Sequence, residues 1–129
     1  MRLLASVLAF YHALNGALML ALPAAWYRLV PGVAESGPLN GHFVRDIGLG
    51  FLAAALALAL AARSARPAPL LWPAALFLGG HAGLHLVEML LHGPAPVAAL
   101  RDLALIALPG LAPLWLLVRP APALAEGRS

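Results

Sequence analysis

The sequence predicts an all-α integral membrane protein, a four-helix bundle that forms one transmembrane domain across residues 1–129. Of the 129 residues, 63% are hydrophobic and 10% are charged, whereas soluble domains are usually about 45–50% apolar and about 25% charged. This length holds about four spans of about 20 residues, so we expect no separate soluble domain. There is no cysteine, which excludes disulfides, thiolate metal sites and thiol catalysis.

Four apolar runs mark the expected spans, at residues 3–22, 39–62, 69–91 and 96–118. The connections after the first and third runs contain adjacent proline and glycine, and the connection after the second is short and basic. Pro38 and Pro96 suit the first turn of a helix, where the missing amide has no helical partner to lose. Pro109 and Pro113 lie inside the last run and predict a kink there.

The arginines predict the orientation and the surroundings. All eight basic residues are arginines that lie singly along the chain, so we expect a lipid bilayer as partner and no nucleic acid. With the N-terminus inside, five arginines are cytoplasmic and three face outward: Arg2, Arg63, Arg66, Arg119 and Arg128 against Arg28, Arg45 and Arg101. This excess predicts a multi-pass protein of the bacterial inner (plasma) membrane with both termini in the cytoplasm.

The first run has an alternative interpretation as a cleaved signal peptide. Arg2, the apolar stretch and residues 23–25 roughly fit that pattern. However, His12 and Asn15 interrupt the apolar stretch. We therefore expect this run to be a span of the bundle.

The pattern of polar residues predicts an internal duplication of a two-helix unit. Two Gly–Pro pairs, at residues 37–38 and 93–94, are each followed after six residues by an Arg–Asp pair, Arg45–Asp46 and Arg101–Asp102. Upstream, His12 in the first run aligns with His81 in the third. Two such units would be related by a pseudo-two-fold axis along the bilayer normal. The alternative is that helices rich in alanine and leucine align with almost any sequence.

The third run carries a line of four polar residues, His81, His85, Glu88 and His92. At 100° per residue these positions fall within an arc of about 60°. An ionised group at bilayer depth costs about 2.5–3.5 kcal/mol, so this line should face the bundle interior or a wet cavity. The other predicted members of an outward-opening polar site come from the remaining runs: His12, Asn15, His42, Arg45, Asp46, Arg101 and Asp102.

These residue types allow three kinds of chemistry. His85 and Glu88 are the candidate catalytic pair, since an acid and a base one turn apart can act on a lipid-soluble substrate. Alternatively, His81, His85 and Glu88 offer nitrogen and oxygen ligands to Zn²⁺ or Cu²⁺ from one helix face. His12 and His81, at matched depth, would suit a haem b held by two histidines. The patterns leave open whether the protein is an enzyme.

Three segments resemble a group of small bacterial four-helix integral membrane proteins that are loosely akin to the DoxX-like families. They are Trp26-Tyr-x-x-Val30-Pro-Gly-Val33, Gly37-Pro-x-Asn40-x-His42-Phe-x-Arg45-Asp46-Ile-Gly48 and His81-Ala-x-x-His85-x-x-Glu88. The similarity extends over most of the chain and implies the four-helix fold. It implies no reaction, ligand or catalytic residue.

Three functional hypotheses follow from the sequence. The first is an inner-membrane protein whose polar site binds a metal ion, a haem or a small amphiphilic ligand. The second is a structural or accessory subunit whose polar residues fasten the helices, with another membrane protein or a second copy of the chain as partner. The third is a component of a proton or ion pathway, against which the apolar inner half of the bundle argues.

Overall fold

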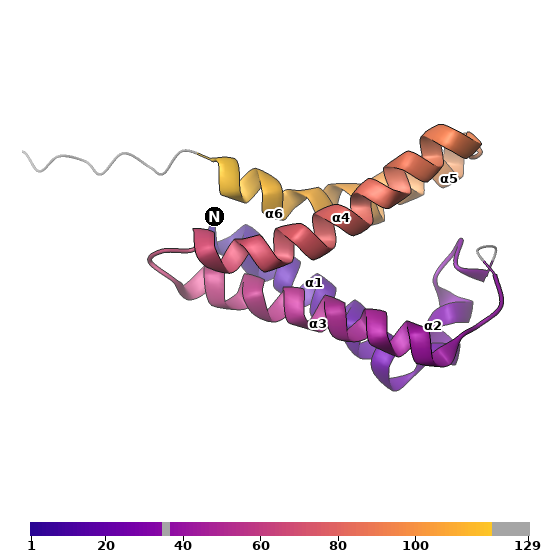
Figure 1. Ribbon diagram of the computed structural model, residues 1–129, viewed down its shortest axis with the longest axis horizontal. Helices are drawn as coiled ribbons and strands as arrows, with labels where there is room; N and C mark the ends of the chain where they lie inside the picture. Colours follow the sequence, from indigo (N-terminus) through magenta and orange to yellow (C-terminus); the bar gives the residue numbers. More distant parts are fainter. Residues whose placement is uncertain (35–36, 120–129) are drawn as a thin grey trace, which may run out of the picture.

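The computed structural model describes residues 1–34 and 37–119, which are mostly helical (Figure 1). In chain order the elements are α1 (Arg2–Ala21), α2 (Pro23–Leu29), α3 (Gly41–Arg63), α4 (Ala68–His92), α5 (Pro96–Asp102), the π-helix η2 (Leu103–Ala107) and α6 (Leu108–Val118). Four stretches are long and apolar enough to cross a membrane: α1, α3, α4 and the continuous stretch Pro96–Val118. The predicted all-α, four-helix class is confirmed. Arg128, which was assigned to the cytoplasmic side, lies outside the described residues.

Local chemistry sets the ends of the two central helices. α3 starts at Gly41 because the side-chain oxygen of Asn40 caps it, accepting a hydrogen bond from the Phe43 amide at 3.1 Å. α4 ends at His92 and is followed by Gly93, whose φ of 56° lies in the left-handed region that favours glycine and closes a helix.

The long helices form two pairs, α1 with α3 and α4 with α6, and each pair makes its closest approach at glycines. A Cβ added to Gly16 would lie 2.7 Å from the Gly48 carbonyl oxygen, and one added to Gly48 would lie 3.0 Å from the Gly16 carbonyl oxygen. In the second pair, a Cβ on Gly110 would lie 2.7 Å from the Ala82 Cβ and 2.8 Å from the Leu78 carbonyl oxygen. Apolar side chains gain little by leaving lipid, so this close backbone packing is what holds each pair together.

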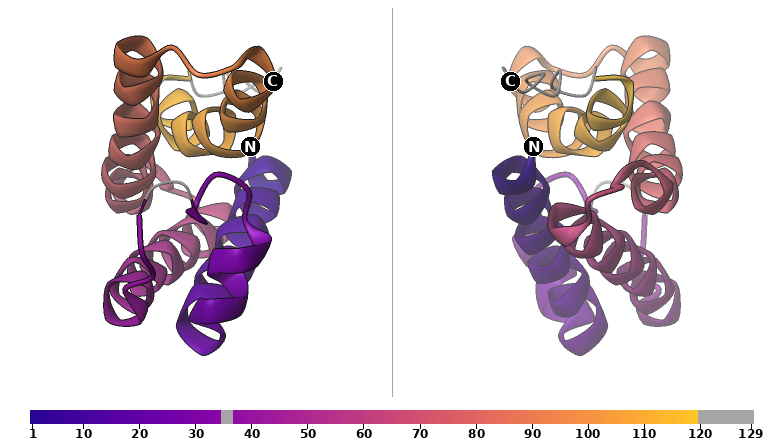
Figure 2. Two further views of the ribbon diagram at one scale, coloured as in Figure 1. Left: turned by 90° about the vertical axis from the view of Figure 1, so that its right-hand side faces the viewer. Right: turned by 90° about the vertical axis from the view of Figure 1, so that its left-hand side faces the viewer.

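The two pairs lie close at one end of the molecule and diverge toward the other (Figures 1 and 2). The hairpin end holds the start of α1, the α3–α4 turn and the end of α6. The splayed end holds α2, the start of α3, the end of α4 and α5. Three leucines at 1% exposure or less form the centre of the core between α3 and α4: Leu58, Leu71 and Leu78. At the splayed end, the segment after α2 reaches α5, because a Cβ on Gly32 (φ +90°) would lie 2.7 Å from an Arg101 guanidinium nitrogen.

Where the sequence predicts a kink, the last span contains a π-helix. Residues Leu103–Ala107 are π-helical, and the Leu108 amide donates to the Leu103 carbonyl, five residues earlier. Pro109 has no N–H, so the carbonyl of Leu105, four residues earlier, has no α-helical donor. A single π turn inside an α-helix is one recognised way to accommodate such a break.

The predicted duplication remains a prediction. The helices pair as two two-helix units would, α1 with α3 and α4 with α6. However, the glycine crossings do not fall at equivalent positions, because the proposed alignment matches Gly16 with His85 and Gly48 with Ala104. The close packing of each pair must therefore have arisen separately if the units share an origin.

The close packing of helices at some glycines predicts that glycine-to-alanine substitutions change stability differently at two positions. Gly16→Ala should lower the free energy of unfolding by about 1–3 kcal/mol, because the new methyl group would overlap the backbone of α3. Gly80→Ala should leave it unchanged or slightly higher, since nothing lies within 4 Å of an added Cβ on this exposed residue. Thermal unfolding in detergent measures both, and equal effects would contradict the proposed role of the crossing.

Candidate functional site

His12 is the one polar side chain that is buried among the described residues, with 3% exposure. It lies on the face of α1 that packs inward, in line with Leu8 and Gly16 at helical spacing. Its ring stacks on Phe51 of α3, with centroids 5.7 Å apart and planes inclined by 17°. Neither ring nitrogen has a hydrogen-bond partner. Leaving such a group unsatisfied costs about 1–3 kcal/mol.

Phe51 links His12 to two histidines of α4. The ring of His81 meets Phe51 edge-on with centroids 5.4 Å apart, and the rings of His81 and His85 are 4.9 Å apart. We call His12, Phe51, His81 and His85 the histidine row. Exposure increases along it, since His12 is buried, His81 and His85 are half-buried, and Glu88 one turn further is exposed. The row therefore runs from the core toward the splayed end.

The three glycines of α4 nearest His81 have different surroundings. An added Cβ on Gly80 or Gly83 would meet nothing within 4 Å, whereas one on Gly79 would lie 2.9 Å from a Leu114 methyl carbon of α6. Gly79 therefore serves helix packing, whereas Gly80 and Gly83 lie about 100° and 160° around α4 from His81, away from the row. In the described chain no hydrogen bond or ion pair joins His85 to Glu88, the predicted acid–base pair.

Tyr11, beside His12, bears a role that the sequence analysis missed. Its hydroxyl donates a 2.7 Å hydrogen bond to the Leu105 carbonyl oxygen, which Pro109 deprives of its helical donor. The Pro109 carbonyl is affected in the same way by Pro113. That carbonyl interacts electrostatically with the His12 ring but does not complete a hydrogen bond with it. The two prolines of the last span were the available signal for these contacts.

Asn15 serves to attach α2 to α1. Its side-chain oxygen accepts a 2.8 Å hydrogen bond from the indole N–H of Trp26, and its amide nitrogen lies 3.6 Å from the Met19 sulfur. Trp26 packs at the edge of the apolar core. Asn15 is therefore an interhelical fastener and lies outside the histidine row.

The polar residues at the start of α3 also lie apart from the row. His42 and Asp46 form a 3.3 Å pair with side chains that are 89% and 55% exposed. Arg45 donates to the Leu20 carbonyl at the end of α1, at 3.2 Å, and so satisfies a carbonyl that the helix terminus leaves unpaired. His42 is nine residues before Phe51, which turns it by about 180° around the helix, away from the core.

Arg101 and Asp102 form an ion pair with 2.7 Å between Nε and Oδ1 and side chains that are 30% and 17% exposed. The Arg101 guanidinium also lies against Gly32, in the segment after α2. Arg101 therefore joins α5 to the segment after α2 at the splayed end. Arg45 and Asp46, which the predicted duplication aligns with this pair, contact Leu20 and His42 instead, so the two Arg–Asp motifs make different contacts.

The structure thus corrects the prediction that all these side chains converge in one cavity. It brings together His12, His81 and His85, and it places the other predicted residues in separate contacts at the splayed end: Asn15, His42, Arg45, Asp46, Arg101 and Asp102. The physical reason is helix rotation, since only the face of α3 that contains Val44, Phe51 and Leu58 is directed inward.

The predicted metal and haem sites are not preformed in this arrangement. Among the described residues, no three histidine or carboxylate side chains gather closely enough to hold a metal ion, so His81, His85 and Glu88 do not form a ready ligand set. His12 and His81 both contact the ring of Phe51. As the side chains lie, Phe51 takes up the space that a porphyrin between the two histidines would need.

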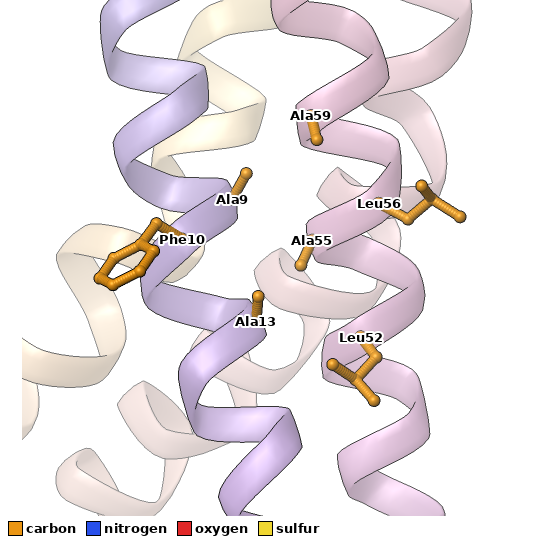
Figure 3. A pocket seen from close by; sticks show the side chains of 7 residues that line it. All are labelled: Ala9, Phe10, Ala13, Leu52, Ala55, Leu56 and Ala59. Atoms are coloured by element: carbon orange, nitrogen blue, oxygen red, sulfur yellow. The ribbon is translucent and has the colours of Figure 1, made fainter.

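A shallow groove of about 370 Å³ lies on the surface of the bundle, between α1 and α3 (Figure 3). Figure 3 shows Ala9, Ala13, Ala55 and Ala59 between the two helices, with Phe10 projecting away. The lining is entirely apolar and includes none of the predicted site residues. This surface suits contact with lipid tails.

Comparisons of the chain with protein-family models, with curated proteins and with solved structures find no match. The resemblance to DoxX-like proteins therefore remains a prediction.

The Tyr11 hydroxyl bonds the Leu105 carbonyl, which Pro109 leaves without a helical donor. We therefore expect substitutions of Tyr11 and Pro109 to have coupled effects on stability. Tyr11→Phe should lower the free energy of unfolding by about 0.5–1.5 kcal/mol. In a Pro109→Ala background the loss should fall to less than half, because this substitution restores an amide donor to the last span. Thermal unfolding of the four proteins in detergent measures this coupling.

Tyr27 provides the control, since its hydroxyl bonds the Gly37 carbonyl at 2.7 Å, away from Pro109. Tyr27→Phe should have the same effect in both backgrounds. If Tyr11→Phe lowered the free energy of unfolding equally in the wild-type and Pro109→Ala backgrounds, the Tyr11 hydrogen bond would not compensate for the donor that Pro109 lacks.

Proposed function

We propose that this protein binds a small amphiphilic molecule at the histidine row, within the membrane and from the splayed end. The proposal rests on one observation, which is the burial of His12 with both ring nitrogens unpaired. In a bilayer, a buried ionisable side chain whose nitrogens make no hydrogen bond is a marker of function. A ligand with a hydroxyl, carbonyl or carboxyl head can supply the missing partner for such a nitrogen.

The surroundings of the row support an amphiphile with a flat or narrow body. Phe51 and Phe77 lie against His81, with centroids 5.4 and 6.5 Å from its ring, and present apolar faces beside the histidine nitrogens. His81 and His85 are only half-buried, so a ligand can approach this part of the row from the surface of α4. A ligand entering there would displace the His12–Phe51 contact to reach the buried nitrogens. Binding pockets for such molecules combine apolar walls with a few polar groups in this way.

The proposed location is the bacterial inner membrane with both termini in the cytoplasm. At the hairpin end the structure collects four arginines, Arg2, Arg63, Arg66 and Arg119, whereas three lie in elements of the splayed end. The positive-inside rule then directs the hairpin end to the cytoplasm. The histidine row would open toward the outer face.

An accessory role is the second candidate, and specific contacts favour it. Asn15, Arg45 and Arg101 each hold one helix or connection against another, as in a scaffold whose partner is another membrane protein. A role in proton conduction has less support. The ring of Phe51 stands between the histidines of α1 and α4 and cannot carry a proton, and the core toward the hairpin end is apolar.

The ligand proposal predicts an unusual result for His12→Phe. The replacement keeps a ring on Phe51 and removes both unpaired nitrogens, so the free energy of unfolding of the ligand-free protein should stay the same or rise. A small molecule that co-purifies with the wild-type protein should be lost. Solvent extraction with mass spectrometry measures that molecule, and thermal unfolding in detergent measures stability.

His42→Phe is the matched control, because His42 is exposed and remote from the row, and it should retain the extracted molecule. A fall in stability for His12→Phe, with unchanged extract, would favour the fastener role. Absorption spectra and elemental analysis of the same samples address the other cofactors. A Soret band would indicate haem, and stoichiometric zinc or copper would indicate a metal site, and either would replace the proposal.

A further inference from the structure

A second hollow, of about 360 Å³, lies at the hairpin end, at the opposite end of the bundle from the open part of the histidine row. Four elements line it: the start of α1, the end of α3 with its turn, the start of α4 and the end of α6. Its walls are mostly apolar and include Ala62, Leu71 and Leu116. The polar groups on its lining are Arg2, Ser64 and Arg119.

The hollow is strongly cationic for a site at a membrane surface. Arg2 and Arg119 belong to its lining, Arg63 is the last residue of α3, and Arg66 lies in the turn that follows. The carboxylates in the described part of the chain, Asp46, Glu88 and Asp102, belong to the opposite end.

The two lining arginines are available to a ligand. In the described chain, Arg2 has no ion pair or hydrogen bond. Arg119 lies over the ring of Trp115, with the guanidinium carbon 4.1 Å from the centroid. That contact holds the guanidinium in place without neutralising its charge.

The depth of the hollow matches a lipid headgroup. It lies where spanning helices begin and end, which is the level of phosphate and glycerol in a bilayer. Arginines there often serve only as general interfacial anchors. Two features distinguish this pair: both arginines border one hollow, and that hollow has an apolar floor. A guanidinium binds a phosphate with paired, charge-assisted hydrogen bonds.

From this geometry we infer that the hairpin end holds one anionic phospholipid, with its phosphate between Arg2 and Arg119 and the first carbons of its chains against Ala62, Leu71 and Leu116. The charge complementarity selects an anionic lipid over a zwitterionic one. Alanines of the lining, among them Ala65 and Ala68, leave the space. This site is independent of the histidine row, so its test and that of the proposed function do not affect each other.

The test is native mass spectrometry of the full chain in detergent with added phosphatidylglycerol or phosphatidylcholine. The wild-type protein should retain one phosphatidylglycerol in preference. In Arg2→Gln/Arg119→Gln that retention should fall about thirtyfold, as expected from about fivefold for each arginine near an anionic headgroup. Arg63→Gln/Arg66→Gln removes the same charge at the same end of the bundle but away from the lining, and it should cause a loss of less than about fivefold.

A third variant tests the hollow itself. Ala65→Phe changes an exposed residue of the lining and fills space without changing charge, so it should lower phosphatidylglycerol retention while the protein unfolds at an unchanged temperature. Equal losses in the two arginine double variants would overturn the proposal in favour of general surface charge. Equal retention of the two lipids, or retention that appears only after deletion of residues 120–129, would also overturn it.

Discussion

The structure depends on one constraint, which is that a polar group inside the hydrocarbon of a bilayer must find its partner within the protein. α1 shows how this constraint fixes the bundle. Its Tyr11 hydroxyl bonds the last span, its final turn receives Arg45 of α3, and its Asn15 receives the indole of α2. Apolar side chains alone slide past one another in lipid at little cost. These three polar contacts therefore set the register of α1 against each of its neighbours.

His12 is the exception to this constraint. Its position is explained by the close packing of α1 and α3 at Gly16 and Gly48. Gly16 is one turn beyond His12 on α1, and Gly48 is one turn before Phe51 on α3. Because the backbones of the two helices meet at these glycines, the side chains one turn away are pressed together. The imidazole is thereby held face to face with a phenyl ring that offers no hydrogen bond. The close packing that stabilises the α1–α3 pair thus leaves the His12 nitrogens without a hydrogen-bond partner.

The sequence predicts the spans well because length and hydropathy depend on each helix alone. The grouping of polar side chains depends on how helices rotate against each other, and that information is less local. The line from His81 to Glu88 follows from spacing within one helix. His42 lies outside the histidine row because it is not on the buried face of α3. The heptad spacing of Val44, Phe51 and Leu58 marks that face in the sequence and could have predicted this. Tyr11 escaped notice because its partner is a carbonyl freed by a proline almost a hundred residues away.

The divergence of the two helix pairs bears on what the histidine row does. His85 points in nearly the same direction around α4 as the fully buried Leu78, seven residues earlier, yet it is only half-buried. The difference arises because α4 has moved away from α3 at that level (Figure 1). One helix face therefore changes from core to accessible surface within two turns, and the row crosses that boundary. A row that opens at one end and has a phenyl ring between its histidines fits the proposed binding of a molecule better than conduction through the membrane.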